Sequence, residues 1–430
     1  MIPIALAILS LLAAPPARQD FALENGIRVT VVHAPGAPRE AIFTILPIGL
    51  LTDDARRAQH SHLLEHALIR STDPLALAAD GFLLNGETQG TTLRLETIAE
   101  PARWREALTR HARWLTVRVF DPVMIEREKT SAAGELDTTV PLGHTQKWAL
   151  AAFAQVVRHG LPHAAVRGDL ASATAGDMQS SAAAHVGPSP RVRIVLVGPV
   201  APKDVRETLE AGIGKLPAMP ALAPAAPVSP VKLAPPGDRA ATWDLAARHH
   251  LEWYPLPDDG PADRVAGALL ATAITQSLMT SAGGAPGTAI ASAEAVPGMG
   301  RLLFVSASLP AGADPAALRA RVRGAIDGLA APAPGMPDLA ARLRMAAAEI
   351  SELPDFAALR KARAGQPGIE FLEANVCLGL VGFEEGTGLV GSEEMAAAFS
   401  KLTPERLAAI VRESLGEKNR STLLLEPPSR

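Results

Sequence analysis

Cysteine is almost absent from this chain of 430 residues, which contains only Cys377. A single thiol excludes an intramolecular disulfide and a cysteine-based zinc site, so any metal ligands must be His, Asp or Glu. We expect Cys377 to be a small, buried, apolar side chain. Aromatic residues make up 4% of the chain, and Tyr254 is its one tyrosine.

Charge of one sign is also lacking, since the net charge is −4. With no basic surplus and no polybasic tract, the sequence predicts no binding to nucleic acid and no attraction to anionic lipid. Apolar residues make up 48% of the chain, which is enough for a sizeable core. The length allows two or three domains of ordinary size.

The N-terminus combines an uncharged apolar run, from Ile2 to Ala14, with a following segment of small residues and prolines. This order is typical of a secretory signal, and the run is too short for a comfortable membrane span. We therefore predict a signal peptide over residues 1–18, cleaved near Ala14 or Ala17. The mature protein would be periplasmic or otherwise exported, with no stable membrane anchor; an uncleaved apolar N-terminus is the alternative.

Two halves of similar size flank a stretch rich in proline and alanine, residues 217–238, which is a linker by composition. Strand and helix patterns recur in a similar order on both sides, which indicates a diverged duplication. We predict an α+β fold in which each half is a mostly antiparallel sheet packed by helices. The predicted domains are residues 19–216 and 239–430.

Local patterns place further elements around the candidate residues. Strands are expected at 27–32, 41–48, 82–84 and 91–98, and helices at 100–117 and 122–136. Asn85-Gly86 is expected to form a turn between two of these strands. The acidic pair Asp53-Asp54 suits the start of the next helix. The isolated pair His249-His250 is expected at the surface.

The most informative stretch is His62-Leu63-Leu64-Glu65-His66. On a helix, positions i, i+3 and i+4 share one face, so both imidazoles can reach one metal ion beside a carboxylate. This H-x-x-E-H order inverts the commoner H-E-x-x-H zinc signature, and its glutamate can act as general base on a zinc-bound water. The alternative is a solvated helix face that carries a Glu–His pair.

A zinc site for hydrolysis needs a third protein ligand and an open position for water. Glu128 and Glu135 lie seven residues apart on a predicted helix, so they share one face two turns apart. One could bind the metal while the other orients a ligand. A charged helix surface is the alternative for both residues.

These motifs resemble those of the pitrilysin/insulinase family of zinc metallopeptidases, the inverzincins. In that family H-x-x-E-H is followed about seventy to eighty residues later by E-x6-E, and here His66 and Glu135 are 135 − 66 = 69 residues apart. The segment Asn85-Gly86-Glu87-Thr88 resembles the family's Asn-Ala-x-Thr edge strand. The resemblance covers nearly the whole mature chain, with specific motifs in the first half and fold-level similarity in the second.

The resemblance implies a pitrilysin/processing-peptidase fold and a role for each matching residue. His62, His66 and Glu135 would bind one Zn²⁺ per chain. Glu65 would be the general base, and Glu128 would be a supporting carboxylate behind the ligands. The domain 19–216 would be catalytic and its homologue 239–430 non-catalytic.

The implied function is that of a zinc-dependent endopeptidase that hydrolyses oligopeptides or unfolded protein segments with a zinc-activated water. Asn85 would bind substrate backbone, and the edge of its strand would accept the peptide by β-addition. The resemblance also implies a closed chamber and a homodimer, or a heterodimer with a homologous subunit.

The sequence departs from the family pattern at several positions. Gln59-His60-Ser61 and Leu63-Leu64 stand where the family often has glycine or an aromatic residue, and His60 is expected to be a bystander. No Arg–Tyr pair for substrate binding is visible in the second half, and residues 283–287 are interpreted as a plain turn. These departures keep open a catalytically weak or inactive member that acts as a scaffold or peptide-binding partner subunit. A zinc-handling protein without peptidase activity would need more exposed histidine clusters.

Overall fold

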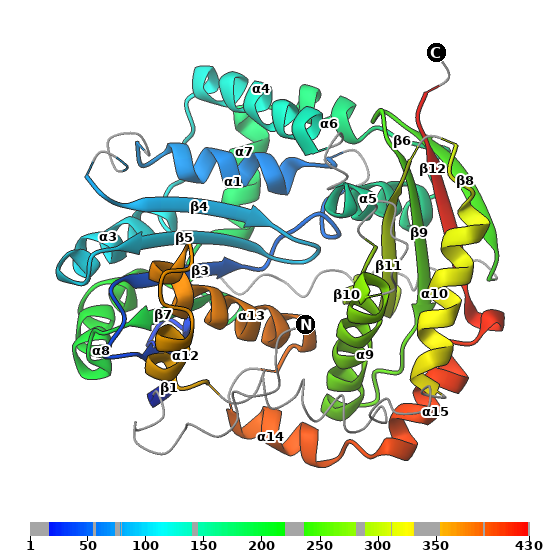
Figure 1. The fold of residues 1–430 in the computed structure, drawn as a ribbon. Helices are drawn as coiled ribbons and strands as arrows, with labels where there is room; N and C mark the ends of the chain where they lie inside the picture. Colours follow the sequence, from blue (N-terminus) through cyan, green and yellow to red (C-terminus); the bar gives the residue numbers. More distant parts are fainter. Residues whose placement is uncertain are drawn as a thin grey trace.

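The computed structural model describes residues 17–54, 57–73, 78, 80–139, 145–219, 236–280, 289–310, 312–330, 353–389 and 392–428. Within them the chain forms two six-stranded sheets packed with helices (Figure 1). The sheet orders are β1-β2-β7-β3-β5-β4 and β10-β11-β9-β12-β8-β6. The predicted α+β fold with two similar halves is confirmed.

The two sheets repeat one topology. The first contains β1 (Ala17–Ala22), β2 (Arg28–His33), β3 (Glu40–Leu46), β4 (Leu83–Thr88), β5 (Leu93–Ala99) and β7 (Arg193–Gly198). The second contains β6 (His163–Ala164), β8 (Asp238–Trp243), β9 (Arg248–Pro255), β10 (Ile290–Val296), β11 (Gly300–Leu309) and β12 (Ser421–Glu426). Strands β2, β3, β4, β5 and β7 correspond in order to β8, β9, β10, β11 and β12. In each sheet the first and last of these five strands pair in parallel. The other pairs among the five are antiparallel.

In each half, one helix follows the second corresponding strand and several lie between the fourth and the fifth. Those of the first half are α1 (His60–Arg70), α3 (Trp104–Trp114), α4 (Pro122–Thr139), α5 (Gln146–Phe153), α6 (Val166–Ser172), α7 (Ala175–His185) and α8 (Pro202–Ala211). Those of the second are α9 (Pro261–Thr280), α10 (Pro315–Ala330), α12 (Phe356–Ala362), α13 (Leu372–Thr387), α14 (Ser392–Ser400) and α15 (Pro404–Ser414). A π-helical turn over Ala154–Arg158 extends α5. Among the described residues, no helix has both the length and the apolar character needed to cross a membrane.

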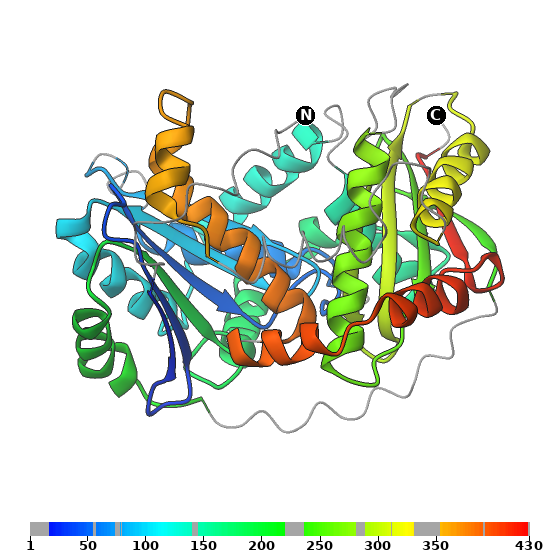
Figure 2. The same cartoon turned by 60° about the horizontal axis from the view of Figure 1, so that its bottom comes forward.

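Each half places one helix on the sheet of the other. The ring of Phe153, at the end of α5, meets Trp253 and Phe304 of the second sheet edge-on, with centroids 5.1 and 4.9 Å apart. In return, α13 packs against the first sheet, where Cys377 shares a buried cluster with Phe43. Figure 2 shows this orange helix running across the blue strands. In the sequence, each of these helices lies between the fourth and fifth corresponding strands of its own half. The two halves therefore exchange equivalent helices.

A buried ion cluster fixes α13 to the first sheet. Arg193 Nη2 of β7 lies 2.5 Å from Glu384 Oε2 of α13, and both side chains are 1% exposed. Arg18 Nη1 contacts the other carboxylate oxygen of Glu384 at 2.8 Å, and Arg193 also donates to Thr30 Oγ1 at 2.8 Å. Burying charges is unfavourable unless the geometry and remaining hydrogen bonds are satisfied, and here Glu384 has two arginine partners.

Two local predictions were wrong. Asn85-Gly86 is not a turn but lies within β4, and the chain reverses at residues 89–92, where Gln89 N–H donates to Thr92 O at 2.8 Å. His249 and His250 are buried rather than exposed, because β9 lies inside its sheet between β11 and β12. The ring of His249 hydrogen-bonds Thr145 Oγ1 at 2.8 Å and Ser306 Oγ at 2.7 Å.

Other predictions have different outcomes. Cys377 is buried as expected, and burial raises the pKa of its thiol to about 12. Strand β8 was missed at the end of the predicted linker. Residues 1–16 of the predicted signal, 220–235 of the linker and the 283–287 segment lie outside the described residues.

Candidate metal centre

The first turn of helix α1 is hydrogen-bonded to a carboxylate from the preceding loop, that of Asp53. Asp53 accepts a hydrogen bond from the Ser61 backbone N–H at 3.1 Å and another from Ser61 Oγ at 2.9 Å. These bonds satisfy polar groups in the first turn of the helix, as a capping residue would. The prediction that the acidic pair begins the helix was wrong, because Gln59 precedes α1 and Asp53 reaches Ser61 from the preceding loop. Burial raises the pKa of Asp53 to about 8.

The three predicted ligands converge between α1 and α4. His62 Nε2 lies 3.2 Å from Glu135 Oε2, and His66 Nε2 lies 3.3 Å from Glu135 Oε1. The two Nε2 atoms are 3.3 Å apart. All three donor groups lie within 4.8 Å of one another, as ligands of a single ion would. The Glu135 side chain is 45% exposed, which leaves one side of the group accessible.

The second nitrogen of each ring has its own partner. His62 Nδ1 lies 2.9 Å from Gln59 Oε1, and His66 Nδ1 lies 3.1 Å from Glu128 Oε2. When Nδ1–H donates to these oxygens, the Nε2 lone pairs face the other ligands, which is the usual arrangement at metal sites. Arg70 Nε in turn contacts Glu128 Oε1 at 2.9 Å.

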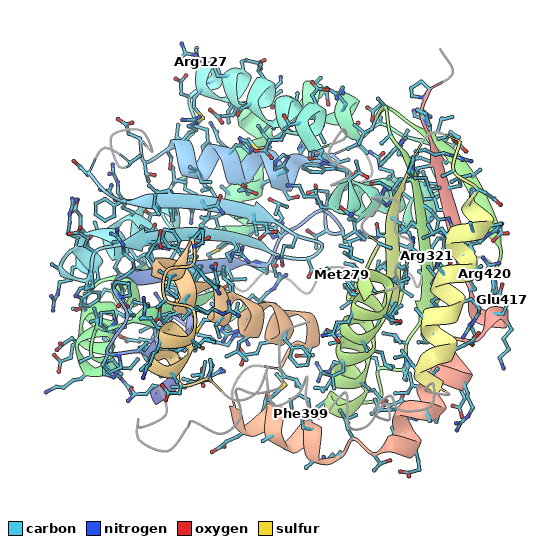
Figure 3. The ribbon with its side chains drawn as sticks, viewed as in Figure 1. Arg127, Met279, Arg321, Phe399, Glu417 and Arg420 are labelled. Atoms are coloured by element: carbon cyan, nitrogen blue, oxygen red, sulfur yellow. The ribbon has the colours of Figure 1, made fainter. Side chains whose placement is uncertain are left out.

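Figure 3 shows that Arg127 extends from the outer side of α4, away from α1. Its neighbour Glu128 is instead buried against the ligand helix. Glu128 thus lies beside His66, while the role predicted for it stays a prediction; Gln59 and Arg70 were not singled out from the sequence. The spacing of Arg70, four residues after His66, would have identified it as a neighbour on the same helix face.

Burial and charge set the protonation of the group. Burial lowers the pKa of His62 to about 4. Burial also acts to lower the pKa of His66, but hydrogen bonding to Glu135 and the charges of Glu65 and Glu135 outweigh it, so this pKa is raised. Contact with the His62 and His66 rings holds the pKa of Glu135 well below its usual range. A carboxylate beside imidazole nitrogens is the donor set that zinc takes in hydrolytic sites.

Glu65 lies between α1 and the edge strand β4. Its side chain is buried, and Oε2 accepts a hydrogen bond from Thr88 Oγ1 at 2.7 Å. Gly86 allows this approach, because a Cβ at that position would lie 2.6 Å from Glu65 Cγ and 2.7 Å from Ile69 Cδ1. Burial raises the pKa of Glu65, despite the opposing hydrogen bond from Thr88.

Asn85 lies on the opposite face of β4 from Glu65. Side chains alternate along a strand, so Gly86 and Thr88 face α1 while Asn85 and Glu87 face away. Asn85 is exposed and hydrogen-bonds Glu96, its partner across the ladder to β5. Strand β4 ends its sheet, with β5 on one side.

Helix α5 contributes two further residues that the sequence did not identify. The buried ring of Trp148 packs on His62 with centroids 4.9 Å apart. Lys147 Nζ lies 4.2 Å above that indole ring and 4.0 Å from Glu135 Oε2. The charge of Lys147 acts to lower the pKa values of His62 and Glu65. The site thus has a cation on its accessible side.

No family profile matches the sequence, and no curated protein matches it. The structure is similar to a protease from Helicobacter pylori, with a TM-score of 0.66, 14% identity, and coverage of 96% of this chain and 100% of the other. An M16-like peptidase from Alicyclobacillus acidocaldarius gives a TM-score of 0.61 and 15% identity, covering 97% and 100%. A peptidase M16 inactive domain from Pseudomonas fluorescens gives 0.58 and 13%, covering 96% and 98%. The chain therefore has the fold of M16-like peptidases, the pitrilysin-type fold that its motifs predicted.

Proposed function

We propose that this protein is a zinc-dependent endopeptidase that hydrolyses oligopeptides or unfolded protein segments. The observation that carries the proposal is the convergence of His62 Nε2, His66 Nε2 and the Glu135 carboxylate, with both Nδ1 atoms held by other oxygens. This donor set fits a tetrahedral zinc ion with three protein ligands and one open position. The likeness to M16-like peptidases supports the reaction class.

The residues divide the chemistry among them. His62, His66 and Glu135 would hold one zinc ion per chain. When bound, zinc supplies Lewis acidity, which acidifies a water molecule and polarises a carbonyl group. Glu65 is the general base: Thr88 fixes its Oε2, and Oε1 is left to take a proton from water and pass it to the leaving amine. The raised pKa of Glu65 brings it closer to the working pH of such a base.

The substrate would bind along β4 as an additional strand. Edge strands present unpaired N–H and C=O groups that an extended peptide can match. Asn85 is exposed on this strand and would contact the substrate backbone. Folded proteins offer few free extended segments, so the expected substrates are oligopeptides and unfolded chains. A second homologous subunit, in a homodimer or heterodimer, would close over the half-exposed Glu135.

Export is part of the same proposal. Arg18 belongs to β1 and pairs with the buried Glu384, so the mature chain needs this residue. Cleavage near Ala14 would keep the whole of β1, whereas cleavage after residue 18 would remove Arg18. N-terminal sequencing of the secreted protein would distinguish these sites.

A catalytically inactive, peptide-binding or scaffold subunit is the second candidate. One protein with this fold is an M16 inactive domain, so the fold is compatible with either function. Both candidates would bind peptides at β4, and they differ in whether they hydrolyse them. The convergence of His62, His66 and Glu135 favours the enzyme.

The test combines zinc analysis with hydrolysis of a quenched fluorescent peptide library. We expect one zinc per chain, cleavage that chelators abolish, and a Glu65→Gln variant that keeps zinc but does not cleave. Zinc without cleavage, for the protein alone and mixed with a homologous subunit, would support the scaffold. Absence of zinc would refute the ligand set, and cleavage by Glu65→Gln would refute the assigned base.

A further inference from the structure

Gln59, the residue before α1, has an unusual backbone. Its φ of 72° and ψ of 1° place it in the left-handed region, and its side chain is completely buried. Among the described non-glycine residues, only Gln59 and Asp73 have a positive φ. This conformation costs a residue with a side chain about 1–2 kcal/mol. Such backbone strain is concentrated at functional sites, where surrounding contacts maintain it.

The side chain of Gln59 makes the contact that this backbone permits. Its Oε1 lies 2.9 Å from His62 Nδ1, on the far side of the ring from Glu135. An amide oxygen only accepts hydrogen bonds, so in this arrangement Nδ1 carries the hydrogen of the neutral imidazole. The lone pair then lies on Nε2, which faces His66 and Glu135. The contact therefore selects both a ring orientation and a tautomer.

The two histidines differ in the residue that contacts their Nδ1 atom. His66 is held by the carboxylate of Glu128, which Arg70 neutralises in part, whereas His62 is held by an uncharged amide. Trp148 packs against the face of His62, so a further charge there would be poorly solvated. An amide meets the hydrogen-bonding need of Nδ1 without burying a second negative charge.

We propose that Gln59 is a positioning residue of the zinc site, which orients His62 and fixes its tautomer, and whose strained backbone is retained for that contact. The inference rests on the proposed zinc site but is separable from it. Loss of a partner behind a metal-ligating histidine typically lowers metal affinity about 10–100-fold. Strain relief, by contrast, raises the stability of the metal-free protein. One substitution should therefore change zinc affinity much more than the stability of the metal-free protein.

The decisive variant is Gln59→Gly, which accepts a positive φ and removes the amide. We expect the metal-free variant to stay folded with a thermal midpoint close to that of the wild type, because strain relief offsets the loss of the buried side chain, while zinc affinity, measured by competition with a chelator, falls about 10–100-fold. The matched control is Asp73→Gly, which relieves the same kind of strain at the other end of α1. The control should stabilise the protein and leave zinc affinity unchanged.

Two conservative variants complete the test. Gln59→Asn tolerates the left-handed backbone but is one methylene shorter, so it should lose zinc affinity with little change in stability. Gln59→Glu keeps an acceptor and should bind zinc within a few-fold of the wild type. If the wild type binds zinc and Gln59→Gly and Gln59→Asn bind it equally well, the inference is wrong while the proposed function stands. If the wild type binds no zinc, the proposed function itself fails.

Discussion

The two halves of the molecule have the same strand topology but different helices after their second corresponding strand. Helix α1 presents His62, Glu65 and His66 to α4. Its counterpart α9 contains neither histidine nor glutamate and buries Val265, Leu269 and related side chains in a core. The comparison teaches that this fold accepts, after the second corresponding strand, either a helix that carries candidate metal ligands or a helix that builds the core.

The edge strands β4 and β10 also differ, in whether a helix side chain occupies their outer backbone groups. In the second half, Thr275 of α9 uses its Oγ1 to accept from Ala291 N–H at 2.8 Å and to donate to Ala291 O at 3.2 Å. This contact occupies backbone groups of β10 that an added strand would need. In the first half, Gly86 of β4 instead lies against Glu65. The proposed peptide edge is therefore on the half that carries the metal ligands.

Loss of a ligand should give the largest effect. His66→Ala should weaken zinc binding by on the order of 1,000-fold, because three ligands share a binding free energy of about 10–16 kcal/mol. The control is His250→Gln in the second half, which should keep one zinc per chain. Metal analysis of the two purified variants, with circular dichroism to confirm folding, tests the asymmetry. Zinc lost from a folded His250→Gln protein would contradict it.

Breaking the contact between the halves should be next in size. Arg193→Met leaves Glu384 buried with one partner fewer, so we expect the free energy of unfolding to fall by about 3 kcal/mol. The double variant Arg193→Met/Glu384→Met should recover much of this loss, because the buried Glu384 carboxylate is removed together with Arg193. Urea denaturation would measure both, and equal destabilisation of the single and double variants would show that the ion pair is not the cause.

The first residues of two corresponding strands provide a pH test. Glu40 of β3 is buried and accepts from Val200 N–H, and burial raises its pKa from 4.5 to about 8. The folded state therefore binds more protons than the unfolded state between these values, so stability falls as pH rises through this window. Glu40→Gln should remove that loss and gain about 3 kcal/mol more at pH 8 than at pH 5.

The corresponding residue in β9 is Arg248, which pairs with Glu426 at 2.9 Å. Arginine stays charged throughout this pH range, so the effect of Arg248→Gln on stability should be the same at pH 5 and pH 8. Thermal denaturation of both variants at the two pH values makes the comparison. A pH-independent effect of Glu40→Gln would mean that this carboxyl is ionised in the folded protein.

Two glycines offer the smallest and most selective test. Gly86→Ala would place a methyl group against Glu65, so turnover should fall about tenfold while zinc is retained, a loss of about 1.4 kcal/mol in transition-state stabilisation. Gly379→Ala lies in α13, where a Cβ meets nothing within 4 Å, so it should stabilise the protein by about 0.5–1 kcal/mol. Full activity of Gly86→Ala would show that Glu65 can shift without loss.

The sequence predicted what depends on local geometry. His62, Glu65 and His66 follow from helical spacing, as does the shared face of Glu128 and Glu135. The convergence of the two helices came from the family resemblance, because spacing within one helix carries no information about its distance from another.

The residues that were missed depend on contacts from distant segments. His249 was expected at the surface because His249-His250 is an isolated polar pair. It is buried instead, and its partners Thr145 and Ser306 come from a distant helix start and a neighbouring strand, which the local sequence does not reveal. Asn85-Gly86 has turn chemistry, but pairing with β5 keeps it extended. Gln59 gave no signal, since glutamine rarely adopts a left-handed backbone.

The reciprocal exchange of α5 and α13 has a consequence for how the chain can be divided. A cut between α8 and β8 would separate a first fragment, whose sheet needs α13, from a second, whose sheet needs α5 and β6. Neither fragment carries the helix that covers its own apolar surface, so each should be insoluble when produced alone. Produced together, they should recognise each other without a covalent connection. The chain would in this respect behave as a split protein, in which the first sheet and the proposed metal site beside it would form only when both fragments fold together.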